Sequence, residues 1–138
     1  MNLNYKISRL IRISHPDGDI LKGIKLSDNI ISSFGESYYS WINRGKRKAW
    51  RYHKKITNNF IVLNGDLNIN IINKIGNVES ICIKSSQNLM FTLFPKTWYG
   101  FECVSDCDVL INNIIDQEFN EDEILRKSIE EFEGKWLV

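Results

Sequence analysis

The stretch GKRKAWRYHKKITNNFIVLNG, residues Gly45 to Gly65, decides the fold prediction. It ends on Asn64-Gly65, the strongest two-residue signal for a β-hairpin, because both positions tolerate a positive φ angle. Upstream of this turn, strand alternation places Ala49, Arg51 and His53 on one face and the intervening aromatic residues on the other. We therefore predict strands around this turn, with a cation and an imidazole side by side on one face.

The chain has 138 residues, of which 43% are hydrophobic, so it has the size of one domain, residues 1–138, with a sizeable core. Its 18 basic and 17 acidic residues give a net charge of +1, and this balance does not require nucleic acid or an acidic membrane as a partner. Basic residues are nevertheless concentrated over residues 44–55. This run fits either a rim that collects phosphate groups or a solvated strand edge protected against aggregation.

Three cysteines, Cys82, Cys103 and Cys107, form no CxxC pair, and an odd number of this kind is typical of free thiols in the cytosol. The N-terminal residues lack an apolar signal core, and no stretch approaches the ~20 apolar residues of a membrane span. We therefore expect a soluble, cytoplasmic protein with no membrane partner and no nucleic-acid partner.

Short β-like runs, separated by turn residues about every eight to twelve positions, predict an all-β sandwich or barrel. The expected strands are 5–13, 37–42, 48–53, 60–63, 67–72, 80–83, 89–93, 98–103 and 108–115. The segment from Asn120 to Phe132 differs, because its apolar residues have helical spacing and follow an Asn cap and a first turn rich in acids. We predict a short C-terminal helix there, packed on the sheet or against a twin subunit.

The quoted stretch resembles the metal-binding motif of the cupins, in which glycine, His, His, Glu and glycine are found at fixed spacing. The corresponding residues are Gly45, Arg51, His53, Asn58 and Gly65. The segment FPKTWYGF, residues 94–101, resembles the second cupin motif, with Tyr99 where the last His ligand would stand. Three of the four ligand positions are changed, and the Arg51 cation would repel a metal ion. The resemblance implies a cupin jelly roll (double-stranded β-helix), and we expect no metal and no other cofactor.

Five segments in order along the chain resemble the sugar-nucleotide cupins. They are PDGDI (16–20), FGESYYSWI (34–42), AWRYHKK (49–55), FPKTWYGF (94–101) and DQEFNEDEILR (116–126). The relatives would be the dTDP-4-dehydrorhamnose 3,5-epimerases and the dTDP-4-keto-6-deoxyglucose 3,4-ketoisomerases. The resemblance implies a homodimer that often exchanges an N-terminal strand. It also implies that the protein acts on a nucleotide-linked 4-keto sugar for surface polysaccharides.

The positions that move protons in these families are partly changed. In the epimerase motif RGLHYQ the catalytic His falls on Arg51, which stays protonated and cannot serve as a base. In the ketoisomerase motif RGGHAHK the second His falls on His53, and an imidazole titrates near neutral pH. The epimerase acid, a Tyr, falls near Asn112. His53 is therefore the candidate base.

Other side chains are candidates for the acid and for substrate binding. A phenolic proton could come from Tyr99, or from Tyr39 or Tyr38 in the position of a ketoisomerase strand. Arg51 would bind a pyrophosphate bidentately or stabilise an enolate. The predicted substrate-binding residues are Lys48, Arg51, Lys55, Asn58, Trp98 and Asn112.

Two classes of function fit these residues. The first is an isomerase that moves a proton next to the keto group, which needs a base, a donor for the enolate oxygen and an acid. The second is a non-catalytic module that binds the sugar nucleotide and has lost the base and the acid. An inward His beside an Arg also fits a purely structural hydrogen-bond network.

Overall fold

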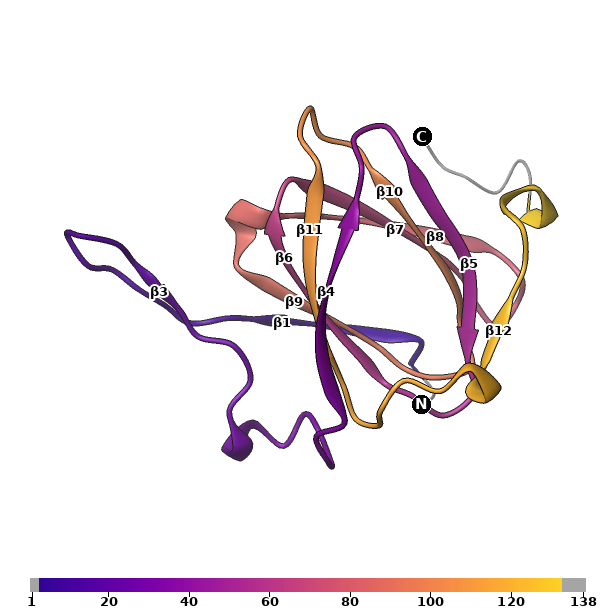
Figure 1. Ribbon diagram of the computed structural model, residues 1–138, viewed down its shortest axis with the longest axis horizontal. Coiled ribbons are helices and arrows are strands. Elements are labelled where there is room, and N and C mark those ends of the chain that lie inside the picture. Colours follow the sequence, from indigo (N-terminus) through magenta and orange to yellow (C-terminus); the bar gives the residue numbers. More distant parts are fainter. Residues whose placement is uncertain (1–2, 133–138) are drawn as a thin grey trace.

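The computed structural model of the protein describes residues 3–132. Within these residues, strands form two five-stranded antiparallel sheets that face each other, and a separate two-stranded hairpin (Figure 1). The first sheet has the order β1-β9-β6-β11-β4, with the bounds Tyr5–Arg9, Leu89–Leu93, Asn58–Asn64, Val109–Ile115 and Glu36–Ile42. The second has the order β12-β5-β10-β7-β8, with the bounds Ile124–Arg126, Arg47–His53, Trp98–Cys103, Asp66–Ile72 and Val78–Lys84. The predicted all-β class is confirmed.

The two sheets enclose a hydrophobic core, because inward and outward side chains alternate along each strand. The alternation is clearest in β11, where every second residue from Val109 to Ile115 is buried. Phe60 of the first sheet lies between Phe91 and Phe101, with ring centroids 6.4 Å and 5.1 Å away. Toward one end of β4, β6 and β11 the inward side chains change from apolar to polar, and the candidate site lies at that end.

The N-terminal segment corrects the prediction of a single strand over residues 5–13. β1 lies at the edge of its sheet, and its pairing stops at Arg9 because the neighbouring strand β9 begins at the facing Leu89. The chain then forms a hairpin from β2, Arg12–Ile13, and β3, Ile20–Leu21. In Figure 1 this hairpin projects from the barrel as an arm, and the 3-10 turn η1, Leu26–Asp28, follows it.

The predicted C-terminal helix is wrong. Residues 120–132 instead form the 3-10 turn η3, Glu121–Glu123, the strand β12 and the 3-10 turn η4, Ile129–Phe132. Asn120 caps the first turn as predicted, because its Oδ1 accepts a hydrogen bond from the backbone N–H of Asp122 at 2.9 Å. After that turn the chain pairs with the open edge of β5, and this long-range pairing overrides the helical periodicity of the local sequence.

The other predicted strands each overlap an observed strand, and the 3-10 turn η2, Ser85–Gln87, joins β8 to β9. All three cysteines are free thiols, as predicted. In the part of the chain that the structure describes, no helix is long and apolar enough to cross a membrane.

Candidate active site

The face of β5 that looks into the barrel carries Lys48, Arg51 and His53. Two of these residues are located by their partners on β10, because Arg51 lies opposite Tyr99 and Lys48 lies opposite Phe101. Both aromatic partners belong to the buried core, and residues directly opposite in an antiparallel pair point to the same face. Two cations and an imidazole therefore line one wall of the barrel.

A β-bulge corrects the predicted alternation along β5. The register of the β5–β10 pair shifts between Tyr99 and Gly100, so β5 has one extra residue at this point. As a result, Ala49 lies opposite Gly100 and faces outward, whereas Lys48 joins Arg51 on the inner face.

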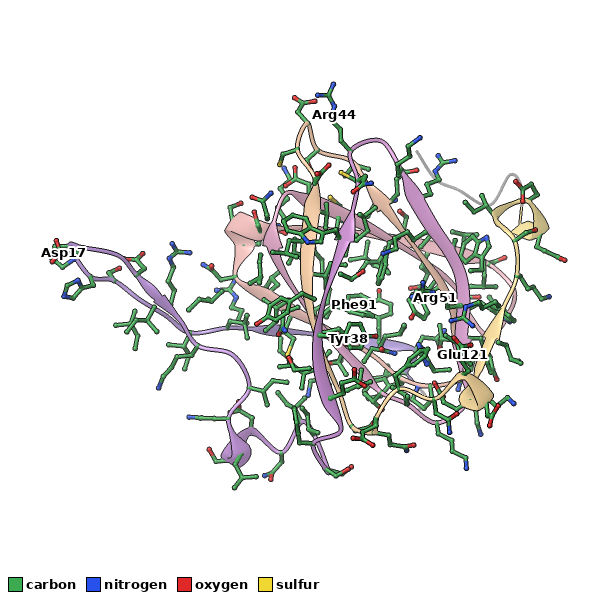
Figure 2. All side chains as sticks on the ribbon, viewed as in Figure 1. Asp17, Tyr38, Arg44, Arg51, Phe91 and Glu121 are labelled. Carbon is green, nitrogen blue, oxygen red and sulfur yellow. The ribbon has the colours of Figure 1, made fainter. Side chains whose placement is uncertain are left out.

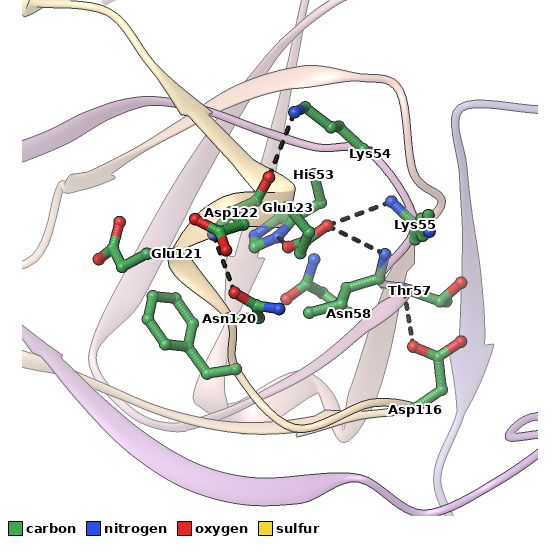
Figure 3. A network of polar contacts seen from close by, with 12 residues as sticks. His53, Lys54, Lys55, Thr57, Asn58, Asp116, Asn120, Glu121, Asp122 and Glu123 are labelled. Atoms are coloured by element: carbon green, nitrogen blue, oxygen red, sulfur yellow. Dashed lines mark hydrogen bonds and ion pairs between the residues drawn. The ribbon is translucent and has the colours of Figure 1, made fainter.

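His53 is the centre of a buried series of hydrogen bonds, and Figure 3 shows the side of this series on which His53 lies beside Glu123. Its Nδ1 pairs with Oε1 of Glu123, and its Nε2 lies 3.0 Å from the hydroxyl of Tyr99. The three residues His53, Glu123 and Tyr99 expose only 4%, 8% and 3% of their surface. Because a carboxylate only accepts, Glu123 takes the bond from Nδ1–H, and Nε2 is left to accept the bond from the Tyr99 hydroxyl. The site thus holds a carboxylate, an imidazole and a phenol in series.

Glu123 reaches His53 because the C-terminal segment folds back along β5. Ile124 is the cross-strand partner of His53, and the backbone N–H of Lys54 donates to the carbonyl of Glu123 at 2.9 Å. The second carboxylate oxygen, Oε2, accepts bonds from the backbone N–H groups of Lys55 at 3.1 Å and Ile56 at 3.4 Å (Figure 3). Both oxygens therefore have donors, as a buried carboxylate requires.

Arg51 and Tyr99 form the inner end of this chain. Burial raises the pKa of Tyr99 well above its ordinary range, and the charge of Arg51 and its hydrogen bond to the phenol act in the opposite direction. The phenol is therefore protonated at neutral pH, and Arg51 can stabilise negative charge on its oxygen. Arg51 takes part in none of the ion pairs formed within residues 3–132, so its guanidinium is also available to an anion.

Lys48 extends the cationic wall. Its Nζ donates to Oγ of Ser40 and to the carbonyl oxygen of Trp41, both at 2.9 Å. Burial lowers the pKa of Lys48, and the positive charge of Arg51 adds to the shift. The two cations therefore repel each other, and an anion bound between them would relieve that repulsion.

The facing sheet supplies a neutral wall. Asn113 of β11 donates from Nδ2 to the Tyr38 hydroxyl at 2.8 Å and to Oδ1 of Asn58 at 2.9 Å, and its own Oδ1 accepts from the backbone N–H of Asn59 at 3.1 Å. Burial raises the pKa of Tyr38, so its phenol keeps its proton. Because the Tyr38 oxygen accepts from Asn113, its O–H can point to another acceptor.

Asn58 has a buried donor with nothing to bind among the described residues. Its side chain is 1% exposed, and its Nδ2 has no hydrogen-bond partner within residues 3–132. Asn58 has the same strand parity as the core residues Phe60 and Val62, so this amide faces into the barrel. A buried donor without a partner is costly unless a ligand satisfies it.

Two predicted site residues point away from this group. Tyr39 on β4 and Asn112 on β11 are cross-strand partners on the outer face of the first sheet, and Tyr39 is 64% exposed. Each lies one residue from the inward side chain on its strand, Tyr38 or Asn113, so strand alternation turns it outward. On β4 and β11 the side chains that point into the barrel at this level are therefore those of Tyr38 and Asn113.

Two more predicted residues lie at the surface of the second sheet. Trp98 lies opposite Tyr52 on the outer face of β10, with ring centroids 5.2 Å apart, and Nζ of Lys127 lies 5.2 Å from its ring centroid. Lys55 has an exposed side chain and contributes its backbone N–H to Glu123. The structure brings neither side chain to His53.

Sequence reasoning missed Glu123 and Asn113. The helix prediction assigns Glu123 to a helical first turn, and only the pairing of β12 with β5 brings it to His53. Asn113 lies one position from the predicted Asn112, and its inward direction follows from the buried residues at every second position of β11. The sequence VLINNII is apolar at both strand parities apart from these two residues, so it gives no signal for which Asn points inward.

The four positions of the cupin metal motif hold Arg51, His53, Asn58 and Tyr99. Within residues 3–132, no group of three or more His, Cys, Asp and Glu side chains could hold a metal ion. The guanidinium of Arg51 has only donors, and both ring nitrogens of His53 already have protein partners. These four side chains therefore do not form the set of imidazole and carboxylate ligands that zinc or iron needs in a cupin.

No protein-family model and no curated protein matches the chain. Solved structures do match. A dTDP-sugar isomerase from Desulfovibrio desulfuricans G20 has a TM-score of 0.83 at 24% identity, over 90% of this chain and 83% of that one. A mutant 3,4-ketoisomerase from Thermoanaerobacterium thermosaccharolyticum, in complex with TDP-4-keto-6-deoxyglucose, has a TM-score of 0.77 at 19% identity, over 92% and 90%. A dTDP-6-deoxy-D-glucose-3,5-epimerase from Legionella pneumophila, in complex with dTDP-4-keto-L-rhamnose, has a TM-score of 0.79 at 11% identity, over 91% and 73%.

These likenesses show the fold. The chain has the architecture of the sugar-nucleotide cupins, and the predicted cupin jelly roll is confirmed. These three structures are isomerases and an epimerase of dTDP-linked sugars, the same classes of protein that the sequence resembles.

Proposed function

We propose that the protein is an isomerase that binds a nucleotide-linked 4-keto sugar and moves a proton on a carbon next to the keto group. The reaction would be of the epimerase or ketoisomerase type and would need no metal. The observation that carries this proposal is the buried chain of Glu123, His53 and Tyr99 inside the barrel. The resemblance to sugar-nucleotide cupins supports a homodimer and a role in the biosynthesis of surface polysaccharides in the cytoplasm.

The hydrogen-bonded series of Glu123, His53 and Tyr99 is suited to removing a proton from carbon. Glu123 holds the proton on Nδ1 of His53, so Nε2 keeps a lone pair that faces the Tyr99 hydroxyl. Either Nε2 takes the proton of the carbon directly, or it takes the Tyr99 proton while the phenol oxygen takes the proton of the carbon. In both cases the C–H electron pair moves into the carbonyl, which becomes an enolate, and Glu123 stabilises the imidazolium.

The facing wall suits the keto oxygen. Nδ2 of Asn58 and the hydroxyl of Tyr38 are neutral donors that can bind a carbonyl oxygen and hold it as it becomes an enolate. Tyr38 can also return a proton on the side opposite His53. Lys48 and Arg51 would bind the diphosphate of the nucleotide through charge-assisted hydrogen bonds.

The test is solvent exchange at the carbon. We expect incubation with dTDP-4-keto-6-deoxyglucose in deuterated water to place deuterium next to the keto group, as detected by NMR. His53→Asn should lower the exchange rate by about 10²- to 10⁴-fold, the usual contribution of general acid–base catalysis, and should leave nucleotide binding intact. His15→Asn, in the turn of the arm, is the control.

If the wild-type protein binds the sugar nucleotide but incorporates no solvent deuterium into any of a panel of 4-keto sugars, the isomerase function is excluded. The non-catalytic binding module would then be the function of the fold. If exchange persists in His53→Asn, the base is another group, and Tyr99 is the next candidate.

A further inference from the structure

A third cation lies beside Arg51, on the strand that the sequence predicts as a helix. Arg126 of β12 is the cross-strand partner of Arg51 of β5, and opposite residues of an antiparallel pair point to the same face. Two residues earlier on β12, Ile124 lies opposite His53 and is buried with it, which confirms that this face looks inward. Arg126 therefore stands at the open edge of the cationic wall.

Glu121, which is not part of the series Glu123, His53 and Tyr99, holds the side chain of Arg126 in this position. Glu121 binds the guanidinium with both carboxylate oxygens, one bond joining Nη1 to Oε2 and the other joining Nη2 to Oε1 at 3.0 Å. The side chains of Arg126 and Glu121 are 47% and 63% exposed, respectively. An ion pair so open to water contributes little to stability, so a second anion can replace the carboxylate at low cost.

The fork geometry fits one class of ligand. A guanidinium that already binds a carboxylate with two parallel bonds has the shape to bind two oxygens of a phosphate in the same way. The neighbouring Arg51 has no carboxylate partner among the ion pairs of residues 3–132, so a phosphate at this edge would face two cations, Arg126 and Arg51. Figure 2 shows Arg51 and Glu121 at the same end of the barrel, and Arg44 at the opposite end.

We propose that Arg126 is an additional diphosphate-binding residue and that Glu121 is its exchangeable counter-ion, which is released when the diphosphate binds. This inference rests on the proposed sugar-nucleotide site and adds a switch to it. In the free protein Glu121 neutralises Arg126 and limits the repulsion along the cationic wall. In the complex the phosphate takes over that role, and Glu121 turns to water.

A double-mutant cycle on anion binding tests the proposal. Calorimetry with inorganic pyrophosphate and with TDP would compare wild type, Arg126→Gln, Glu121→Gln and the double variant. We expect Arg126→Gln to weaken binding by about tenfold, the loss of one charge-assisted contact. Glu121→Gln should strengthen binding by roughly threefold, because it removes a weak competing ion pair. In the Arg126→Gln background, Glu121→Gln should have no further effect.

The controls separate a local contact from a change in total charge or in folding. Arg44→Gln removes the same charge from an exposed position far from the site and should leave both affinities unchanged. Arg126→Lys keeps the charge without the fork and should lie between wild type and Arg126→Gln. The proposal is wrong if Arg126→Gln binds as wild type, if Glu121→Gln acts equally in both backgrounds, or if the wild type binds neither anion. Deuterium exchange measures the proposed isomerase activity separately. The isomerase proposal and the proposal for Arg126 and Glu121 can therefore fail independently.

Discussion

The two walls of the barrel have opposite chemical character. The wall built by β5, β10 and the segment that leads into β12 carries the permanent cation Arg51 and three groups that can exchange protons, namely His53, Tyr99 and Glu123. The wall built by β4, β6 and β11 carries neutral amides and a phenol, centred on Asn113. The fold thus separates two kinds of side chain: those of the first wall suit proton transfer and anion binding, and those of the second suit a neutral oxygen.

The largest effect is expected on the first wall. Glu123→Gln should lower the rate of solvent deuterium exchange by about a hundredfold, because a neutral amide stabilises the imidazolium poorly and no longer fixes the proton on Nδ1. NMR of the keto sugar measures this rate. Asp122→Asn, at the neighbouring exposed acid, is the control and should exchange as wild type. Equal rates in Glu123→Gln and wild type would remove Glu123 from the mechanism.

The second effect concerns the anion. Arg51→Ala should weaken TDP binding by about ten- to hundredfold, since it removes a charge-assisted contact from a partly buried site. Calorimetry gives the dissociation constant, and Arg44→Ala is the matched control for charge. Unchanged TDP affinity in Arg51→Ala would mean that this wall does not bind the diphosphate.

The third effect is on stability and contrasts two neighbours on β11. Asn113→Ala should lower the free energy of unfolding by about 2 kcal/mol, because it leaves the buried N–H of Asn59 and the Oδ1 of Asn58 without this partner. Asn112→Ala, on the outer face of the same strand, should cost about 0.5 kcal/mol or less. Urea unfolding measures both variants. Similar losses for the two would show that the inner wall is not the organised network described above.

The smallest effect is confined to alkaline pH. Because burial raises the pKa of Tyr99, the unfolded chain loses this proton above pH about 10 while the folded chain keeps it. Stability therefore falls as pH rises from that point toward the raised value. Tyr99→Phe should lose less stability than wild type over this interval, and Tyr39→Phe on the exposed outer face should behave as wild type. Equal slopes in Tyr99→Phe and wild type would contradict the buried, neutral phenol.

The sequence predicts the central strands because their signals are local. Alternation and turn residues define β5, β6, β7, β10 and β11, and the Asn64-Gly65 hairpin and the glycine spacing point to the barrel. The resemblance to the cupin motifs assigns His53 and Tyr99 to two ligand positions of one site, and the structure places Nε2 of His53 3.0 Å from the Tyr99 hydroxyl. Arg51 lies on the predicted face, but Lys48 replaces Ala49 there because a one-residue bulge reverses the alternation beyond it.

The rest of the site depends on contacts that are distant in the sequence. Glu123 lies 70 positions from His53, and its segment has the local pattern of a helix, so no window of sequence reveals its role. The pairing of β12 with β5 decides the structure there, because it satisfies the open edge of a sheet. Tyr39 and Asn112 illustrate a different limit, since an error of one residue in strand parity moves a side chain to the opposite face.

The central claim is that Glu123 fixes His53 as a base with its lone pair on Nε2. The chain has two histidines, so His15→Gln leaves His53 as the single imidazole. Every histidine ring signal in the 15N NMR spectrum then belongs to His53, and couplings to the ring carbon-bound protons distinguish Nδ1 from Nε2. For the neutral ring the structure predicts the tautomer with a protonated Nδ1 and an unprotonated Nε2. Glu123→Gln should reduce the excess of this tautomer over the other one. A spectrum with the proton on Nε2 and a bare Nδ1 would contradict the mechanism.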